Sequence, residues 1–145
     1  TTHAEVAASD LVRAAIPATT RDDFYALSPR QFEKFVAQLF RRKGYQVQVR
    51  GSSGDLGVDL EVINRHGRKA VVQCKRYQST VGPDIVRELF GTMIHELADH
   101  GFLVTTADIS DSAREWAVGK PMTLIDGREL ERIAAKLGVV SLPKR

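Results

Sequence analysis

The sequence of 145 residues contains a single cysteine, Cys74, and no long run of apolar residues. One cysteine excludes a disulfide within the chain and a cysteine-rich metal site, and it fits a reducing compartment, so we expect a cytoplasmic protein. No apolar stretch approaches the roughly 18 residues of a membrane helix. No signal-peptide pattern opens the sequence either. We therefore expect no membrane contact from this segment.

The sequence also lacks a large excess of one charge: it has 21 basic and 18 acidic residues, so the formal net charge is only +3. Such an excess is compatible with a polyanionic partner but does not identify one. Hydrophobic residues at 43% and charged residues at 27% are ordinary globular values, which argues against disorder, collagen and coiled coil. The length fits one domain with a sizeable core, and no internal repeat or low-complexity segment appears.

The chain divides into a short N-terminal part and one domain. Residues 4–16 have the apolar spacing of a helix and are followed by Pro17 and a Thr-containing link. We expect an outlying helix and linker over residues 1–26 and a compact domain over residues 27–145.

The strongest helix start lies at Ser28. Its side chain can cap the helix, Pro29 fits the first helical position, and Gln31 completes a reciprocal capping box. A broad apolar stripe follows, and Gly44 ends the helix. Three further helices are expected after Gly82–Pro83, after Ser110 and after Asp126, where Glu129 completes a second capping box.

Five segments have strand patterns: residues 45–49, 57–64, 68–76, 102–106 and 122–125. With the helices, the order is α β β β α β α β α. The first half is linked by a hairpin and the second half alternates strand and helix. This order predicts an α/β fold with a mixed central sheet and helices on both faces.

The hairpin register decides which side chains share a face of the sheet. A turn at residues 65–67 pairs Leu60 with Val72 and Val58 with Cys74 on an apolar face. The other face then pairs Asp59 with Gln73, and Lys75 lies roughly 7 Å beyond Gln73. These three polar groups are expected to converge on one side of the sheet.

Asp59, Gln73 and Lys75 suit one kind of chemistry. Carboxylate and amide oxygens are ligands that Mg²⁺ accepts. The lysine ammonium has no lone pair for a cation, but it can balance the charge of a phosphate or orient a water. Together they are the ingredients of metal-assisted phosphodiester hydrolysis. The alternative, a solvent-facing hairpin surface, is weakened because Val71 and Ile63 share this face.

The runs GSSGDLGVDLEV and AVVQCKRYQS resemble the Mrr-like restriction endonucleases, a branch of the PD-(D/E)XK nuclease superfamily. The helix SPRQFEKFVAQLFRRKGYQV and the segments FLVTTADIS and LIDGREL extend the resemblance over residues 27–137. It implies a restriction-endonuclease-like fold. It also implies a Mg²⁺-dependent endonuclease acting on DNA, with Mn²⁺ as a substitute ion and with foreign or modified DNA as a candidate substrate.

The resemblance assigns roles to individual residues. Asp59 would be the metal-binding acid, Lys75 the catalytic lysine, and the backbone carbonyl of Cys74 a further metal ligand. Gln73 stands where the wider superfamily usually has Asp or Glu, and a neutral amide holds Mg²⁺ less tightly than a carboxylate. The Mrr-like branch commonly has this glutamine. Glu33 matches a family carboxylate that approaches the site from the first helix, which implies a metal or water role.

Further residues are candidates for contacts around the site. The glycine-rich turn and the end of the catalytic strand would touch DNA; a plain strand connection and a solvent-facing strand end are the alternatives. The Cys74 side chain is expected to be a core thiol, and His95 and His100 to be surface residues at helix ends. The candidate DNA contacts are Ser52, Ser53, Arg76, Tyr77 and Gln78.

Three functions compete at this point. A DNA endonuclease is favoured, a nucleic-acid-binding module without turnover is the main alternative, and a nucleotide-binding regulatory domain rests only on the glycine spacing of residues 51–57. The sequence leaves open the recognised sequence or base modification, the preference for DNA over RNA, the pairing of two copies, and an attached recognition domain outside these residues.

Overall fold

The computed structural model describes residues 20–50 and 57–139. Its helices are α2 (Arg21–Tyr25), α3 (Pro29–Arg42), α4 (Pro83–His95), α5 (Asp111–Ala117) and α6 (Gly127–Leu137), and its strands are β1 (Gln46–Val49), β2 (Leu60–Ile63), β3 (Lys69–Lys75), β4 (His100–Thr105) and β5 (Met122–Ile125). The helix expected over residues 4–16 lies outside the described residues. No helix of the described part is long and apolar enough to cross a membrane.

The five strands form one sheet in the order β1-β2-β3-β4-β5. Strands β1, β2 and β3 pair antiparallel, whereas β3, β4 and β5 pair parallel. The sheet is therefore mixed, as predicted, and the change from antiparallel to parallel pairing occurs at β3. This strand is central and carries Gln73 and Lys75 at its carboxyl end.

The helices start where the local signals at Ser28 and Asp126 predict, but only the first predicted capping box is complete. The Ser28 hydroxyl accepts a bond from the Gln31 amide, and the Gln31 side chain accepts one from the Ser28 amide. Asp126 caps α6 by accepting from the Glu129 amide at 2.8 Å. The Glu129 carboxylate instead accepts from Arg114, so the second capping box is only half formed.

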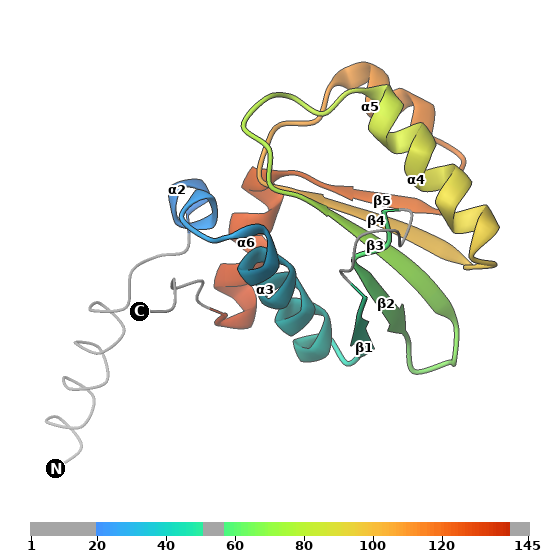
Figure 1. The fold of residues 1–145 in the computed structure, drawn as a ribbon, viewed down its shortest axis with the longest axis horizontal. Helices are drawn as coiled ribbons and strands as arrows, with labels where there is room; N and C mark the ends of the chain where they lie inside the picture. The colour runs from blue at the N-terminus through green and yellow to red at the C-terminus, as the bar shows by residue number, and fades with distance from the viewer. Residues whose placement is uncertain (1–19, 51–56, 140–145) are drawn as a thin grey trace, which may run out of the picture.

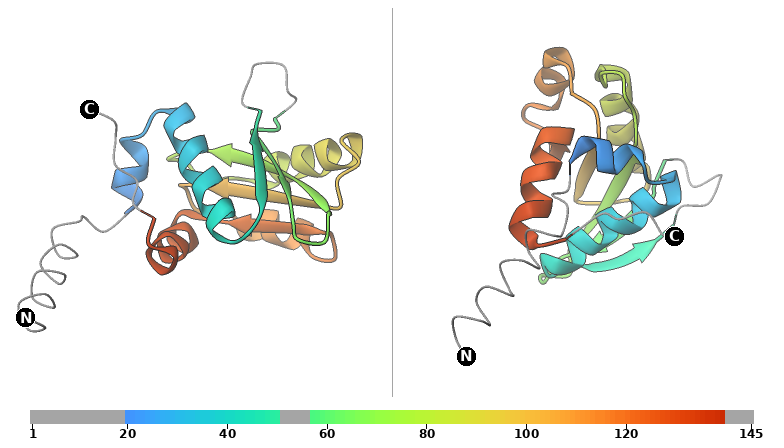
Figure 2. Two further views of the ribbon diagram at one scale, coloured as in Figure 1. Left: turned by 90° about the horizontal axis from the view of Figure 1, so that it is seen from below. Right: turned by 90° about the vertical axis from the view of Figure 1, so that its left-hand side faces the viewer.

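Two hydrophobic cores lie on opposite faces of the sheet (Figure 1). One face is covered by α2, α3 and α6, and Figure 2 shows these helices from two further directions. The other face is covered by α4 and α5. Alternate residues of β3 enter different cores, since Ala70 and Val72 face α3 while Val71 faces α4.

Helix α2 was not predicted. Thr20 caps it, and Phe24 is fully buried and packs on Phe32 and Phe35 of α3. Phe24 thus belongs to the core although it precedes residue 27, where the compact domain was expected to begin. The division of the chain at that point stays a prediction.

Ion pairs attach α4 to the antiparallel strands. The Arg50 guanidinium lies 2.6 Å from a Glu96 carboxylate oxygen and 3.5 Å from Glu61. The hydrogen bond from Arg50 lowers the pKa of Glu96. These contacts hold the carboxyl end of α4 against the sheet, so that the helix runs beside Gln73 and Lys75.

Candidate active site

Strand β2 begins with a β-bulge at Asp59. The pairing of Leu60 with Val72, Val62 with Ala70 and Ile63 with Lys69 is the predicted register. The Asp59 amide, however, also donates to the Val72 carbonyl, at 2.9 Å. Two residues, Asp59 and Leu60, therefore stand opposite one, which is the pattern of a bulge.

The bulge changes which side chains share a face, so the predicted pairing of Asp59 with Gln73 and of Val58 with Cys74 is wrong. Val58 packs with Val71 in the core under α4, whereas Cys74 packs against the core under α3. One extra residue shifts every position beyond it to the opposite side. Asp59 consequently lies on the α3 side, while Gln73 and Lys75 face α4.

The Asp59 carboxylate is fixed at the backbone of β3. Its Oδ2 accepts a hydrogen bond from the Cys74 amide at 2.6 Å. Its main-chain carbonyl accepts another from the Arg50 amide at 2.8 Å. The carboxylate therefore lies level with the peptide that joins Gln73 to Cys74, where β2 and β3 separate.

The side chain of Glu33, on α3, is hydrogen-bonded to that of Asp59. Burial and the neighbouring Asp59 charge, together with a hydrogen bond between the two carboxyl groups, raise the pKa of Glu33 to about 7. Two negative charges on neighbouring carboxyl groups repel, which disfavours the state in which both groups are ionised. The structure thus brings Glu33 and Asp59 together as a pair of carboxyl groups that holds a proton near neutral pH.

Gln73 occupies a confined position on the other side of β3. Its residue is 6% exposed, and its Oε1 is buried without a hydrogen-bond partner among the described residues. A Cβ atom on Gly57 would lie 2.6 Å from Gln73 Nε2, so the amide packs directly under this glycine. Gly57 has φ of +82°, a conformation that favours glycine. A buried acceptor without a partner is uncommon and needs an explanation, such as a bound ion or water.

Lys75 ends β3 at the mouth of an open cleft. Gly57, Gln73 and Lys75 line one side of this cleft, whose volume is about 540 Å³, and α4 lines the other. The Lys75 Nζ lies 5.5 Å from the centre of the Tyr77 ring. The main-chain carbonyl of Lys75 accepts a 2.6 Å hydrogen bond from the buried Thr105 hydroxyl, which anchors the end of β3 to β4.

The other sequence candidates fall around this site. Cys74 is half-buried and packs against the core under α3, and desolvation followed by the Asp59 and Glu33 charges raises the pKa of its thiol, which agrees with a core thiol. Arg76 has a structural contact within the chain, because its guanidinium donates a hydrogen bond to the Tyr25 carbonyl at 3.3 Å. Tyr77 and Gln78 are exposed. Ser52 and Ser53 lie outside the described residues.

Of the two histidines that were expected to be surface residues at helix ends, His95 fits the expectation and His100 does not. His95 is exposed, ends α4 and lines the cleft with Lys75. His100 instead begins β4; its Nε2 lies 2.7 Å from the Thr123 hydroxyl, and burial lowers its pKa. The prediction for His100 is wrong because the strand starts two residues earlier than the apolar run suggests.

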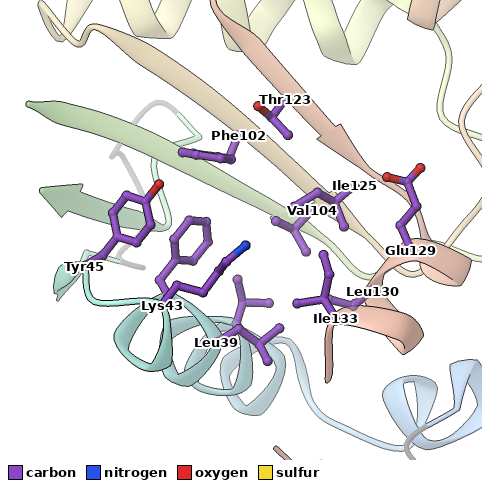
Figure 3. A pocket seen from close by; sticks show the side chains of 12 residues that line it. Leu39, Lys43, Tyr45, Phe102, Val104, Thr123, Ile125, Glu129, Leu130 and Ile133 are labelled. Atoms are coloured by element: carbon purple, nitrogen blue, oxygen red, sulfur yellow. The ribbon is translucent and has the colours of Figure 1, made fainter. Parts of the chain in front are cut away.

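A second cavity lies away from these polar groups. It has a volume of about 220 Å³ and is surrounded by side chains of α3, β4, β5 and α6 (Figure 3). Its lining is mainly apolar, including Leu39, Phe102 and Ile133, with Lys43 and Glu129 at its border. It contains none of Glu33, Asp59, Gln73 and Lys75.

Known proteins with the same fold and sequence pattern include nucleases. The type IV methyl-directed restriction enzyme EcoKMrr of Escherichia coli strain K12 is 31% identical over 127 residues, which are 82% of this chain and 42% of that protein. The chain thus spans less than half the length of this relative. The DNA modification-dependent restriction endonuclease AspBHI superposes with a TM-score of 0.70 at 22% identity, over 86% of this chain and 37% of that one.

A third likeness is to the MspJI restriction endonuclease in complex with a 27-mer oligonucleotide, with a TM-score of 0.58 and 24% identity over 81% of this chain and 30% of that one. At such identities the superpositions show the fold, which is restriction-endonuclease-like. The Mrr_cat restriction endonuclease model matches residues 24–134, which include Glu33, Asp59, Gln73 and Lys75. The chain belongs to the Mrr restriction endonuclease family.

Proposed function

We propose that this chain carries the catalytic centre of a divalent-metal-dependent endonuclease that hydrolyses phosphodiester bonds in DNA. Asp59, Gln73, Lys75 and Glu33 would form the centre. The observation that carries the proposal is the buried Gln73 Oε1, which has no hydrogen-bond partner within the described part of the chain. It lies one peptide from the amide that binds the Asp59 carboxylate, and on the same side of β3 as Lys75.

The donor set fits a hard cation. Asp59, Glu33, Gln73 Oε1 and the Cys74 carbonyl offer only oxygen, which Mg²⁺ and Mn²⁺ prefer. The described residues contain no group of three or more His, Cys, Asp or Glu side chains that could hold a metal ion. Water and substrate phosphate would therefore complete the coordination, as is usual for Mg²⁺. When bound, the cation would neutralise charge on the phosphate and activate a water.

The residues of the chain have separable roles in this proposal. The Cys74 amide holds the Asp59 carboxylate in one orientation. Gly57 leaves room for the Gln73 amide. Lys75 would stabilise the negative charge that develops on the phosphate during in-line attack. Glu33, with a pKa of about 7, would release its proton when the site is loaded.

The substrate is proposed to be foreign or modified DNA, because EcoKMrr is described as methyl-directed and AspBHI as modification-dependent. Arg76, Tyr77 and Gln78, which directly follow β3, and Ser52 and Ser53 stay proposed DNA contacts. Since this chain spans 42% of EcoKMrr, a recognition domain outside it would suit the proposal, as would pairing of two copies. A cytoplasmic location also stays a prediction.

The test is cleavage of supercoiled plasmid, supplied with and without cytosine methylation, in Mg²⁺, in Mn²⁺ and in EDTA. The wild-type chain should nick or linearise the plasmid only with a cation. Lys75→Ala should lower the cleavage rate by at least about 100-fold while duplex binding changes little. Lys136→Ala, which removes an exposed lysine of α6, is the control and should cleave normally.

Two outcomes would contradict the proposal. Cleavage by Lys75→Ala at the wild-type rate would remove the assigned mechanism. DNA binding without cleavage in either cation, on either plasmid, would instead favour the nucleic-acid-binding module. That alternative has some support because Gln73 stands at the position where the wider PD-(D/E)XK superfamily usually has Asp or Glu.

A further inference from the structure

Helix α4 presents one face to the cleft that contains Gln73 and Lys75. The residues on this face follow the helical spacing i, i+3, i+4 and i+7. They are Glu88, Gly91, Thr92 and His95. A molecule that fills this cleft beside Lys75 therefore also lies against this face of α4.

Gly91 is the unexpected member of this face. It lies in the interior of a helix of 13 residues, where glycine is less favourable than any residue except proline. It is exposed, and apart from the backbone of its own helix no described atom lies within 4 Å of the position that a Cβ would occupy. Packing within the described chain does not require a glycine here.

Other glycines of the described residues show the contrast. A Cβ on Gly127 would lie 2.1 Å from the Thr106 carbonyl oxygen, so a close approach within the chain explains that glycine. A Cβ on Gly101 would touch Leu89 and Met93 at 3.5 Å. At Gly91 no atom of the described residues lies near the Cβ position, which faces the cleft, so the glycine leaves room there for a molecule bound in the cleft.

The cleft indicates which kind of molecule approaches. Its lining mixes polar and charged groups, with the Lys75 ammonium and the Gln73 amide on one wall and the Glu88 carboxylate and His95 on the other. A neutral apolar ligand would leave these groups without partners. A sugar–phosphate chain has both the charge for Lys75 and a bulky backbone that needs a flat surface beside it.

We propose that α4 is one wall of the DNA-binding cleft, and that the sugar–phosphate backbone next to the reacting phosphate packs on the helix at Gly91. This inference rests on the proposed function, because it takes DNA as the ligand of the cleft. Gly91 is a positioning residue, since it has no side chain with which to take part in the reaction. Its role is to let the strand come close enough for a phosphate to reach Lys75.

The experiment compares Gly91→Ala and Gly91→Gln with Ala135→Gln, which adds the same side chain to an exposed position of α6. Each variant of the 145-residue chain is measured for melting temperature, for affinity to a fluorescent 30-base-pair duplex in EDTA, and for plasmid cleavage. Both Gly91 variants should melt about 3 °C higher than wild type, because alanine and glutamine favour helix more than glycine does. A residue with a purely structural role would not combine greater stability with weaker binding.

Gly91→Gln should weaken duplex binding at least about tenfold and slow cleavage, with a smaller effect for Gly91→Ala, whereas Ala135→Gln should match wild type. Equal affinity and equal cleavage for Gly91→Gln and Ala135→Gln would overturn the assignment of α4, as would a wild-type chain that does not bind the duplex.

The nuclease proposal is judged separately, by cation-dependent cleavage and by Lys75→Ala. If wild type cleaves, Lys75→Ala does not, and Gly91→Gln behaves like Ala135→Gln, only the α4 inference fails. If wild type binds DNA in a Gly91-sensitive way but never cleaves, the α4 inference stands and the nuclease proposal fails.

Discussion

The two sides of β3 differ in what they offer to a ligand. On the α3 side, Asp59 and Glu33 form a pair of acids that is held by a backbone amide and backed by the hydrophobic core. On the α4 side, Gln73 and Lys75 line an open cleft that also includes the glycines at positions 57 and 91. The α3 side therefore offers a ligand two carboxyl groups and a titratable proton, whereas the α4 side offers open space beside Gln73 and Lys75.

The bulge at Asp59 would let both sides contribute to the proposed site. In an undisturbed hairpin, Asp59 and Gln73 would be neighbours on one face of the sheet. The extra residue instead moves the acid toward α3, while its carboxylate still reaches the peptide between Gln73 and Cys74. A cation at this strand end would therefore meet oxygen ligands from both directions. Variants on each side should then fail in different ways.

The largest effect is expected from the charge of Asp59. Asp59→Asn keeps an oxygen that can accept from the Cys74 amide but removes the negative charge, so cleavage in saturating Mg²⁺ should fall at least about 100-fold. Glu61→Gln is the matched control, because it neutralises an acid of the same hairpin whose partners are Arg50 and Lys69. Plasmid cleavage and thermal melting of both variants test this, and more than a tenth of wild-type activity in Asp59→Asn would contradict it.

A smaller effect on cleavage should come from filling the space beside Gln73 on the α4 side. Gly57 and Gly67 have similar positive φ angles, +82° and +78°, so alanine should destabilise both positions by about 1–2 kcal/mol. Only at position 57 would the new methyl group lie 2.6 Å from Gln73 Nε2, whereas Gly67 has open space. Displacing the amide should raise the Mg²⁺ concentration for half-maximal cleavage about tenfold.

This pair of glycine variants separates backbone strain from the site itself. Thermal melting gives the loss of stability, and a Mg²⁺ titration of cleavage gives the change at the site. If Gly67→Ala shifts the Mg²⁺ requirement as much as Gly57→Ala, strain alone explains the result, and Gln73 does not depend on Gly57.

Much of the fold could be predicted because its signals are local. The cap at Ser28 and the apolar stripe after it predict α3, and the turn at residues 65–67 fixes the hairpin register as far as Leu60. Helix α2 has only five residues, too few for a periodic pattern. Its remaining signal is the reciprocal cap between Thr20 and Asp23, followed by Phe24, and it was missed.

The candidate site could be predicted in its residues but not in its geometry. Asp59, Gln73 and Lys75 are chemically distinctive, and Glu33 came from the family resemblance. The bulge has no local signal, because Val58 and Asp59 fit regular alternation equally well. It depends on Val58 entering the core under α4, which is a tertiary effect. The open space at Gly91 likewise follows from the placement of α4 over the strand end.

The smallest expected effect is the pH dependence of stability, which comes from Glu33 on the α3 side. The pKa of Glu33 is about 7 in the folded protein and about 4.5 for the free side chain. Between these values the folded state keeps a proton that the unfolded chain has released, so the stability of the metal-free protein falls as the pH rises through this window. Above pH 7 the loss is complete and constant.

Glu33→Gln should remove this loss, because glutamine does not ionise and can still donate to Asp59. In EDTA the variant should melt about 3 °C above wild type at pH 8 and nearly equal to it at pH 4.5; the difference is modest because Glu33 is partly exposed. Glu115→Gln, at an exposed position of α5, should show no such dependence. Added Mg²⁺ should then stabilise wild type more than Glu33→Gln at pH 8, because only wild type gains a cation beside two ionised acids. Parallel melting curves across the whole pH range would mean that Glu33 and Asp59 do not share a proton, and the α3 side would lose its distinguishing property.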